Sequence, residues 1–116
     1  MAVADCLFCK IVTGEVPATV VKETDRVLAF RDINPQAPTH VLTIPRDHHQ
    51  DLAALTRADP DLLAEVMEVA VGVAESEGIV DPGYRVVFNT GAGAGQTVFH
   101  VHAHLLGGRG LGWPPG

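Results

Sequence analysis

The chain has 116 residues, 47% hydrophobic and 19% charged, and its 14 acidic residues against 8 Lys and Arg give a formal net charge of -6. This length suits one domain that buries roughly two thirds of the surface of its unfolded chain, so we expect a single domain over residues 1–116. The acidic balance argues against a nucleic-acid-binding protein, whose affinity depends on a basic face. A small phosphorylated ligand remains compatible, because one anionic group needs only a local cluster of donors.

The first residues do not resemble a targeting segment. They lack the basic region and apolar run of a signal peptide, and no stretch approaches the roughly 20 apolar residues of a membrane helix. We therefore expect a cytoplasmic protein with no membrane partner. In a reducing compartment its two cysteines, Cys6 and Cys9, would be thiols or zinc ligands rather than a disulfide.

The chain begins with a predicted short helix over residues 6–13. Asp5 is the expected cap residue, and Gly14 ends the helix. Positions three apart lie on one face of a helix, so Cys6 and Cys9 are expected to point the same way.

Strands are predicted after this helix. Short runs rich in Val and aromatic or aliphatic residues at 19–23 and 26–32 predict a β-hairpin. Residues 33–39 contain two prolines and predict a loop, because proline cannot donate to a strand ladder. A third strand follows at residues 40–45.

The longest predicted helix begins at Asp59, a cap residue followed by Pro60 and by Asp61 in the first turn, and it ends at Gly78. Its apolar residues recur at three- and four-residue steps and predict one buried stripe: Leu63, Val66, Met67, Ala70, Val73 and Ala74.

Two more strands are predicted, at residues 84–89 and 97–106. The order of elements indicates an α+β domain. We expect one long helix to cover an antiparallel sheet of about five strands, which is close to the usual sheet size.

The last predicted strand contains three of the six histidines, His100, His102 and His104, within a stretch of five residues. In a strand they would point the same way along a line of about 13 Å, since the rise is about 3.3 Å per residue. All three cannot bind one zinc ion, whose ligand nitrogens lie about 2.1 Å from the metal, but neighbouring pairs can. The plainer interpretation is a polar sheet face that happens to use histidine. The density of histidines favours a chemical role instead.

A glycine-rich loop, residues 89–96, precedes these histidines. Alone, such a loop is most simply a flexible hairpin connection, but before three histidines it is a candidate phosphate-binding loop. Neutral imidazole is nucleophilic near pH 7 and can form a phospho-histidine, while neighbouring imidazoles donate or protonate. The sequence contains no GxxxxGK[ST] motif, so a P-loop enzyme is excluded.

The pattern HVHAHLL at 100–106 resembles the His-φ-His-φ-His-φ-φ signature of the histidine triad proteins, and the resemblance extends over nearly the whole chain. Together, INPQAPTH and the terminal WPPG resemble the histidine triad nucleotide-binding branch, whose members act as purine nucleoside phosphoramidases. Two sister branches fit less well. Nucleotidylyltransferases of the galactose-1-phosphate type have glutamine where His104 stands, and dinucleoside polyphosphate hydrolases generally lack this tail.

The resemblance implies the histidine triad fold, a homodimer, a bound purine nucleotide such as AMP or GMP, and no catalytic cofactor. The implied reaction converts a nucleoside 5′-phosphoramidate of the AMP–amine type to nucleoside monophosphate and amine. By the family pattern His102 attacks phosphorus to form a nucleotidyl-histidine, His104 and Thr97 contact the phosphate and leaving group, and His40 supports the histidines. Position 97 departs from close relatives, which usually carry serine.

The resemblance also implies a nucleotide-binding set that covers base, ribose, phosphate and the partner subunit's site: Leu7, Phe8, Ile11, Phe30, Asp32, Ile33, Asn89, Gly95, Gln96, Thr97, Val98, His102, His104 and Trp113. Plainer interpretations exist for some of these. Asp32 could simply initiate a turn, and the apolar residues could simply pack in the core.

A Cys-x-x-Cys motif, Cys6 and Cys9, is similar to the one in histidine triad proteins that hold a structural zinc. That resemblance implies His48 and His100 as the other two ligands, with His49 as a rival for His48. A Cys₂His₂ set is a closed, structural zinc site. Two buried thiols are the alternative. If zinc binds, His100 is structural while His102 and His104 are catalytic.

Two other classes of function stay open at this stage. One is a non-catalytic regulator that senses purine nucleotides in the same pocket. The other is a zinc-dependent binding or structural module. The intact His102 favours the hydrolase, because a binding protein needs no nucleophile.

Overall fold

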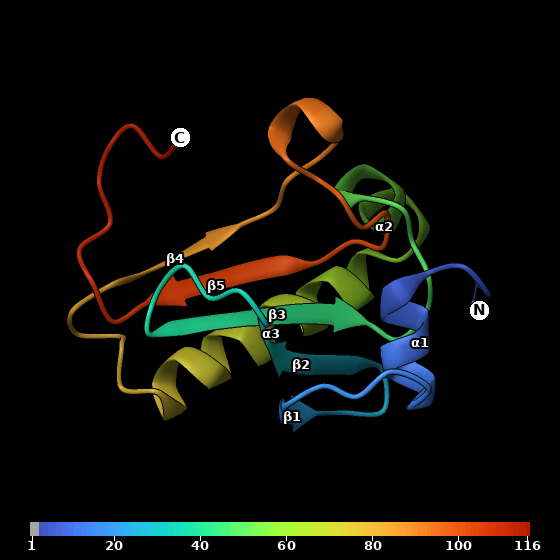
Figure 1. Cartoon of the computed structure of the whole chain (residues 1–116), viewed down its shortest axis with the longest axis horizontal. Helices are drawn as coiled ribbons and strands as arrows, with labels where there is room; N and C mark the ends of the chain where they lie inside the picture. The colour runs from blue at the N-terminus through green and yellow to red at the C-terminus, as the bar shows by residue number, and fades with distance from the viewer. Residues whose placement is uncertain (1–2) are drawn as a thin grey trace.

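The computed structural model describes residues 3–116, which form a five-stranded antiparallel sheet with helices on both faces (Figure 1). The strands are β1 (Val20–Glu23), β2 (Val27–Arg31), β3 (Thr39–Pro45), β4 (Tyr84–Val87) and β5 (Ala103–Gly107). Their order across the sheet is β1-β2-β3-β5-β4. The predicted α+β class and five-stranded sheet are therefore confirmed, with strand ends that differ mostly by one or two residues.

Both faces of the central strands are buried. Every residue of β3 is buried, as are the first four of β2. Because side chains alternate between faces, Val27 and Ala29 join the core under the long helix, whereas Leu28 and Phe30 join a second core on the opposite face.

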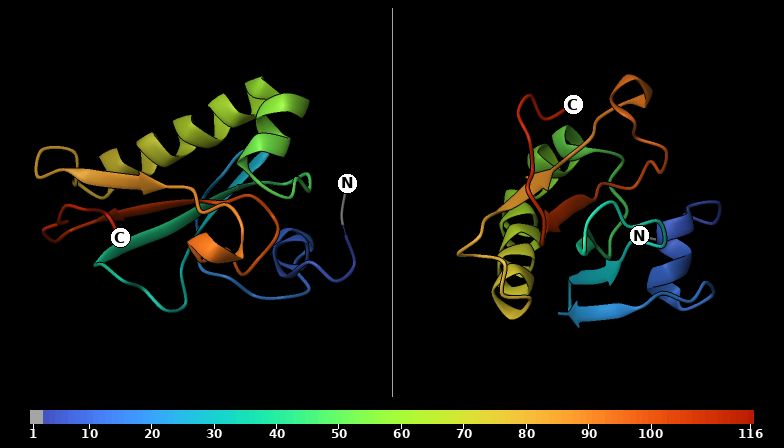
Figure 2. Two further views of the ribbon diagram at one scale, coloured as in Figure 1. Left: turned by 90° about the horizontal axis from the view of Figure 1, so that it is seen from above. Right: turned by 60° about the vertical axis from the view of Figure 1, so that its left-hand side comes forward.

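The long helix α3 (Pro60–Ser76) covers one face of the sheet, as Figure 2 shows. Asp59 caps it by accepting a hydrogen bond from the N–H of Leu62, and Pro60 stands in the first turn, as predicted. A second helix, α2 (Leu52–Ala58), was not predicted. Its seven residues bury only Leu55, so its sequence pattern is too short to stand out.

The short helix α1 (Leu7–Thr13) lies against the other face (Figure 2). Its predicted end is confirmed, since Gly14 adopts the left-handed conformation with φ 84°. The predicted cap, Asp5, is wrong: the cap residue is Cys6, whose sulfur accepts a hydrogen bond from the N–H of Cys9.

The predicted strand at 97–106 is also wrong in its first half, because β5 begins only at Ala103. Its ladder with β3 ends at the Thr43–Ala103 pair. Beyond that point the N–H of Val101 donates instead to the carbonyl of His49 at 2.7 Å. This segment is therefore held by contacts with a loop, and its histidines need not point the same way. The glycine-rich loop before it contains a 3₁₀ turn, η1 (Ala92–Ala94).

Among residues 3–116, no helix has the length and apolar character needed to cross a membrane.

Candidate active site and adjoining metal centre

The register of the strands brings the residues of the candidate site together. Phe30 of β2 pairs with Leu42 of β3, and Leu42 pairs with His104 of β5. These three side chains line one cavity, and His102 reaches it from the segment just before β5. The ring centroids of His102 and His104 lie 4.9 Å apart.

His102 is held as a neutral imidazole in one tautomer. Its Nδ1 lies 2.8 Å from the carbonyl oxygen of His100, and since a carbonyl only accepts, Nδ1 carries the proton. Burial lowers the pKa of His102 below its usual range, so the ring is uncharged at pH 7. Its Nε2 therefore keeps a lone pair, which is what a nucleophile requires.

His104 is held in the opposite tautomer. The backbone N–H of Gln36 donates to Nδ1 of His40 at 3.0 Å, so neutral His40 carries its proton on Nε2. That Nε2 lies 2.9 Å from Nδ1 of His104 and donates to it. The proton of His104 is consequently on Nε2, and this N–H is available as a donor.

His40 and His104 form a hydrogen-bonded relay, and burial keeps both rings neutral. It lowers the pKa of His40 against the opposing effect of Asp32, whose Oδ2 lies 3.5 Å from His40 Nε2. Burial, helped by His102 and His40, lowers the pKa of His104 to about 4. Both rings are thus neutral at pH 7, which is the condition that the tautomer assignment needs.

The cavity beside these histidines has a volume of about 400 Å³. It is mostly apolar, and α1 forms one wall with Leu7, Phe8 and Ile11. Eleven of the residues predicted to bind nucleotide line it: Leu7, Phe8, Ile11, Phe30, Asp32, Ile33, Gly95, Thr97, Val98, His102 and His104. A concave, mainly apolar site with a few convergent polar groups is typical of a small-molecule pocket.

Three predicted nucleotide-binding residues do not line this cavity. Gln96 is buried, and its side chain accepts from the N–H of Gly91 and donates to the carbonyl of Gln50, so it holds the loop. Asn89 is half-buried elsewhere, and Trp113 is 84% exposed. His40, predicted to support the histidines, contacts His104 and is likewise absent from the lining.

Both interpretations of Asp32 have a structural basis. Its Oδ1 accepts a hydrogen bond from the N–H of Asn34 at 2.8 Å, which is the turn-forming role. The same residue lines the cavity and lies near His40. Ile33, its neighbour, is fully exposed at the cavity, so it does not pack in the core.

Sequence reasoning missed several contributors. The N–H of Gln36, which decides the tautomers, is a backbone group and leaves no signature in the sequence. Further lining residues are Val16, Pro17, Ala18, Arg31 and Leu42. Of these, only Leu42 carried a signal, since it lies two residues after His40 in the same predicted strand.

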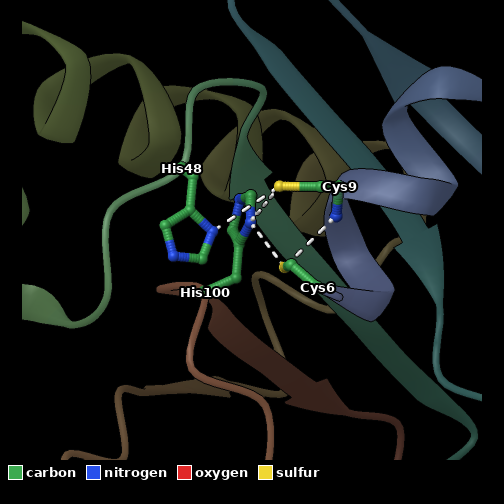
Figure 3. Close-up of side chains that lie close together, drawn as sticks. All are labelled: Cys6, Cys9, His48 and His100. Carbon is green, nitrogen blue, oxygen red and sulfur yellow. Dashed lines mark hydrogen bonds between the residues drawn. The ribbon is translucent and has the colours of Figure 1, made fainter. Parts of the chain in front are cut away.

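A second cluster of candidate metal ligands is shown in Figure 3. The side chains of Cys6, which caps α1, Cys9 of α1, His48 of the loop after β3, and His100 point toward one another. Their ligand atoms all lie within 4.8 Å of one another. The rival histidine, His49, lies outside this group. The predicted set of four is therefore brought together from three separate segments.

The distances fit a tetrahedral zinc ion. Nδ1 of His100 lies 3.4 Å from the sulfur of Cys6 and 3.6 Å from that of Cys9, and Nδ1 of His48 lies 3.5 Å from the sulfur of Cys9. A tetrahedron with Zn–S of about 2.3 Å and Zn–N of about 2.05 Å has S···N edges of about 3.6 Å. The donor set is closed, which is typical of structural sites.

The outer contacts of His100 prepare it for this role. Its Nε2 lies 2.8 Å from the carbonyl oxygen of Pro45 and must donate to it, so Nδ1 presents a lone pair to the sulfurs. This arrangement is typical of metal-binding histidines. Burial lowers the pKa of His100 to about 4 and raises the pKa of the Cys6 thiol, so only a bound cation would readily deprotonate the sulfur.

Comparison with known proteins gives a consistent result. The HIT domain model matches residues 13–111. A 14 kDa zinc-binding protein from Zea mays is 52% identical over 112 residues, which cover 95% of this chain and 87% of that protein. Adenylylsulfatase HINT1 from Arabidopsis thaliana is 46% identical over 113 residues, covering 95% and 76%.

The crystal structure of a HIT family hydrolase from Legionella pneumophila superposes with a TM-score of 0.93 at 54% identity, covering 97% of this chain and all of that one. These matches support a hydrolase and confirm the resemblance drawn from the histidine pattern. With the match over residues 13–111, they show that the chain belongs to the HIT family.

Proposed function

We propose that this protein hydrolyses purine nucleoside 5′-phosphoramidates of the AMP–amine type through a nucleotidyl intermediate on His102. One observation carries the proposal: His102 and His104 are adjacent but hold opposite tautomers. One ring therefore offers a lone pair and the other an N–H donor at the same end of the cavity. A displacement at phosphorus needs this pair, a nucleophile and a group that stabilises developing negative charge.

In the proposed reaction Nε2 of His102 attacks the α-phosphorus, and a new N–P bond forms as the P–N bond to the amine breaks. Nε2–H of His104 donates to a phosphate oxygen as charge develops there. Water then cleaves the intermediate. In this second step the hydroxyl goes to phosphorus as the bond to Nε2 of His102 breaks, and the proton goes to solvent, replacing the one that the amine nitrogen took from solvent when it left in the first step. The products are nucleoside monophosphate and free amine, and both imidazoles return to their starting state.

The nucleotide is assigned to the cavity from its chemistry. The apolar wall of Leu7, Phe8 and Phe30 would enclose a base such as that of AMP or GMP, and Asp32 would accept from the ribose hydroxyls. Gly95 and Thr97 would meet the phosphate. As in the resemblance, Asn89 and the backbone of Gly95, Gln96, Thr97 and Val98 would bind the phosphate. Trp113 would act on the partner subunit's site in a homodimer.

A structural zinc ion at Cys6, Cys9, His48 and His100 is part of the same proposal. The cluster geometry supports it, as does the naming of the Zea mays relative as a zinc-binding protein. A bound zinc would tie α1 to the sheet, and no catalytic metal or cofactor is proposed. Two free thiols suit a reducing compartment such as the cytoplasm.

The test uses an adenosine 5′-phosphoramidate with a fluorogenic amine and no added divalent cation, beside a His102→Ala variant shown to be folded by circular dichroism. Release by the wild type alone supports the proposal. Because the Arabidopsis relative is named an adenylylsulfatase, adenylyl sulfate is assayed in parallel. Cleavage of adenylyl sulfate alone would show that the enzyme breaks a phosphorus–oxygen bond and not a phosphorus–nitrogen bond. AMP binding with no cleavage of either substrate would favour a nucleotide-sensing regulator.

A further inference from the structure

The metal centre and the nucleotide cavity share two segments of the chain. Helix α1 and its cap residue supply Cys9 and Cys6 to the first, and the helix supplies Leu7, Phe8 and Ile11 to the second. The segment before β5 supplies His100 to the metal centre and His102 to the cavity. A shift of either segment would therefore change both sites.

His100 is the first direct link. Its side chain faces the sulfurs of α1, while its backbone carbonyl accepts the hydrogen bond from Nδ1 of His102 at 2.8 Å. The opposite side of the His100 ring is tied to the carbonyl of Pro45 at 2.8 Å. A metal that holds this ring thus also holds the carbonyl that selects the tautomer of His102.

Phe8 is the second link. It lies between the two cysteines in sequence, and its ring packs edge-on against His102 with centroids 5.0 Å apart and against His100 at 6.0 Å. The same ring lines the cavity and packs against Phe30 at 5.4 Å. The position of α1 therefore sets both the base-binding wall and the packing of the nucleophile.

We propose that zinc at this centre positions His102 and the α1 wall, so that zinc and nucleotide bind with positive coupling. His100 acts as a positioning residue for the nucleophile. The inference rests on the proposed function, because it assigns the nucleotide to this cavity. Ordering α1 is required for both ligands, and whichever binds first reduces the ordering that the second must impose. Coupling free energies are reciprocal, so each ligand must tighten the other by the same factor, about tenfold within the usual range.

The experiment starts from the zinc-loaded protein. A chromogenic chelator competes for zinc with and without saturating AMP, and ribose 5-phosphate at the same concentration controls for zinc binding by the phosphate. We expect AMP to raise zinc affinity about tenfold and ribose 5-phosphate to have little effect. Equal zinc affinity with and without AMP, in protein that binds AMP by calorimetry, overturns the coupling while the proposed function survives. Absence of AMP binding overturns both.

A matched pair of variants locates the link. Phe8→Leu keeps an apolar residue on α1 but removes the ring that contacts His102, and Phe88→Leu makes the same change in the core under α3. Phe8→Leu should bind zinc with the wild-type affinity but show at least threefold weaker coupling, whereas Phe88→Leu should retain it. Equal coupling in both variants would show that the Phe8 ring does not transmit the effect.

The tautomer of His102 can be measured directly, and a zinc ion that only stabilised the fold would not change it. Long-range ¹H–¹⁵N spectra of the imidazoles distinguish a protonated Nδ1 from a protonated Nε2. In zinc-loaded protein we expect His102 to show a single Nδ1–H tautomer, and in the zinc-depleted protein, or in His48→Ala if depletion unfolds the chain, a mixture of the two. An unchanged single tautomer in the metal-deficient form contradicts the positioning role of His100.

Discussion

The carbonyl oxygen of His100 accepts a hydrogen bond from Nδ1 of His102 at 2.8 Å. One residue thus presents its side chain to a cluster of thiols and its backbone to a nucleophile. The bond holds the proton of His102 away from the cavity and leaves Nε2 free. The alternation of histidines in the sequence therefore corresponds to three different environments: a metal centre, a nucleophile and a donor relay.

Replacing His40 by Ala should lower kcat roughly tenfold to a hundredfold and leave AMP affinity nearly unchanged. The substitution removes the N–H that donates to Nδ1 of His104 at 2.9 Å, so that His104 no longer presents one fixed tautomer. Steady-state kinetics with the phosphoramidate and calorimetry with AMP measure the two effects. Gln36→Ala is the control, because the backbone N–H that fixes His40 remains. A full-rate His40→Ala enzyme would eliminate the relay.

The adjacent histidines at 48 and 49 offer a paired test of the metal centre. His48→Ala should weaken zinc binding by at least about a hundredfold, more than the loss of an outer partner usually costs, because Nδ1 of His48 is one of the four donors. His49→Ala should bind zinc normally, since the His49 side chain is not in the ligand cluster and its backbone carbonyl, which accepts from Val101, remains. Zinc content after dialysis against a chelator distinguishes the two. Retention by His48→Ala, or loss by His49→Ala, would reassign the ligand.

The free energy of unfolding should decrease as the pH is lowered, partly because of His104. Its pKa is about 4 in the folded protein against the usual 6.5. Below pH 6.5 the unfolded chain therefore takes up a proton that the folded protein does not. The contribution of His104 to the free energy of unfolding is fully present above pH 6.5. It is lost as the pH falls toward 4, and the loss is at most about 3 kcal/mol.

Urea unfolding of wild type and His104→Gln at pH 7 and pH 4.5 checks this. The variant should lose less stability over that interval, and the protonation of the metal ligands cancels in the comparison because both proteins share it. Equal losses in the two proteins would mean that His104 titrates normally.

Gly107 is required by packing. A Cβ at this position would lie 2.5 Å from Cδ1 of Ile79 and 3.2 Å from its Cβ, so Gly107→Ala should destabilise the fold by about 1–3 kcal/mol. Adding Ile79→Val removes the nearest clashing atom and should restore part of the loss. Gly110→Ala, with nothing within 4 Å of the new Cβ, should be neutral. Additive losses in the double variant would argue against this contact.

Local patterns carried the prediction of most elements. The cap at Asp59 with Pro60 and the three- and four-residue apolar steps define α3, and Gly14 ends α1, because these signals depend on backbone groups within one helical turn. The same locality explains two failures. The cap at Cys6 was missed because cysteine is not an ordinary cap residue, and α2 was missed because it buries only Leu55.

The sequence by itself determined which residue types are available for the chemistry: three alternating imidazoles, a Cys-x-x-Cys pair and a glycine-rich loop. The tertiary structure alone decided which ring nitrogen of each imidazole carries the proton. The proton positions of His102 and His104 depend on a carbonyl and on the N–H of Gln36. Such backbone groups are the same in every sequence, and only folding brings a particular one within hydrogen-bonding distance of a particular ring.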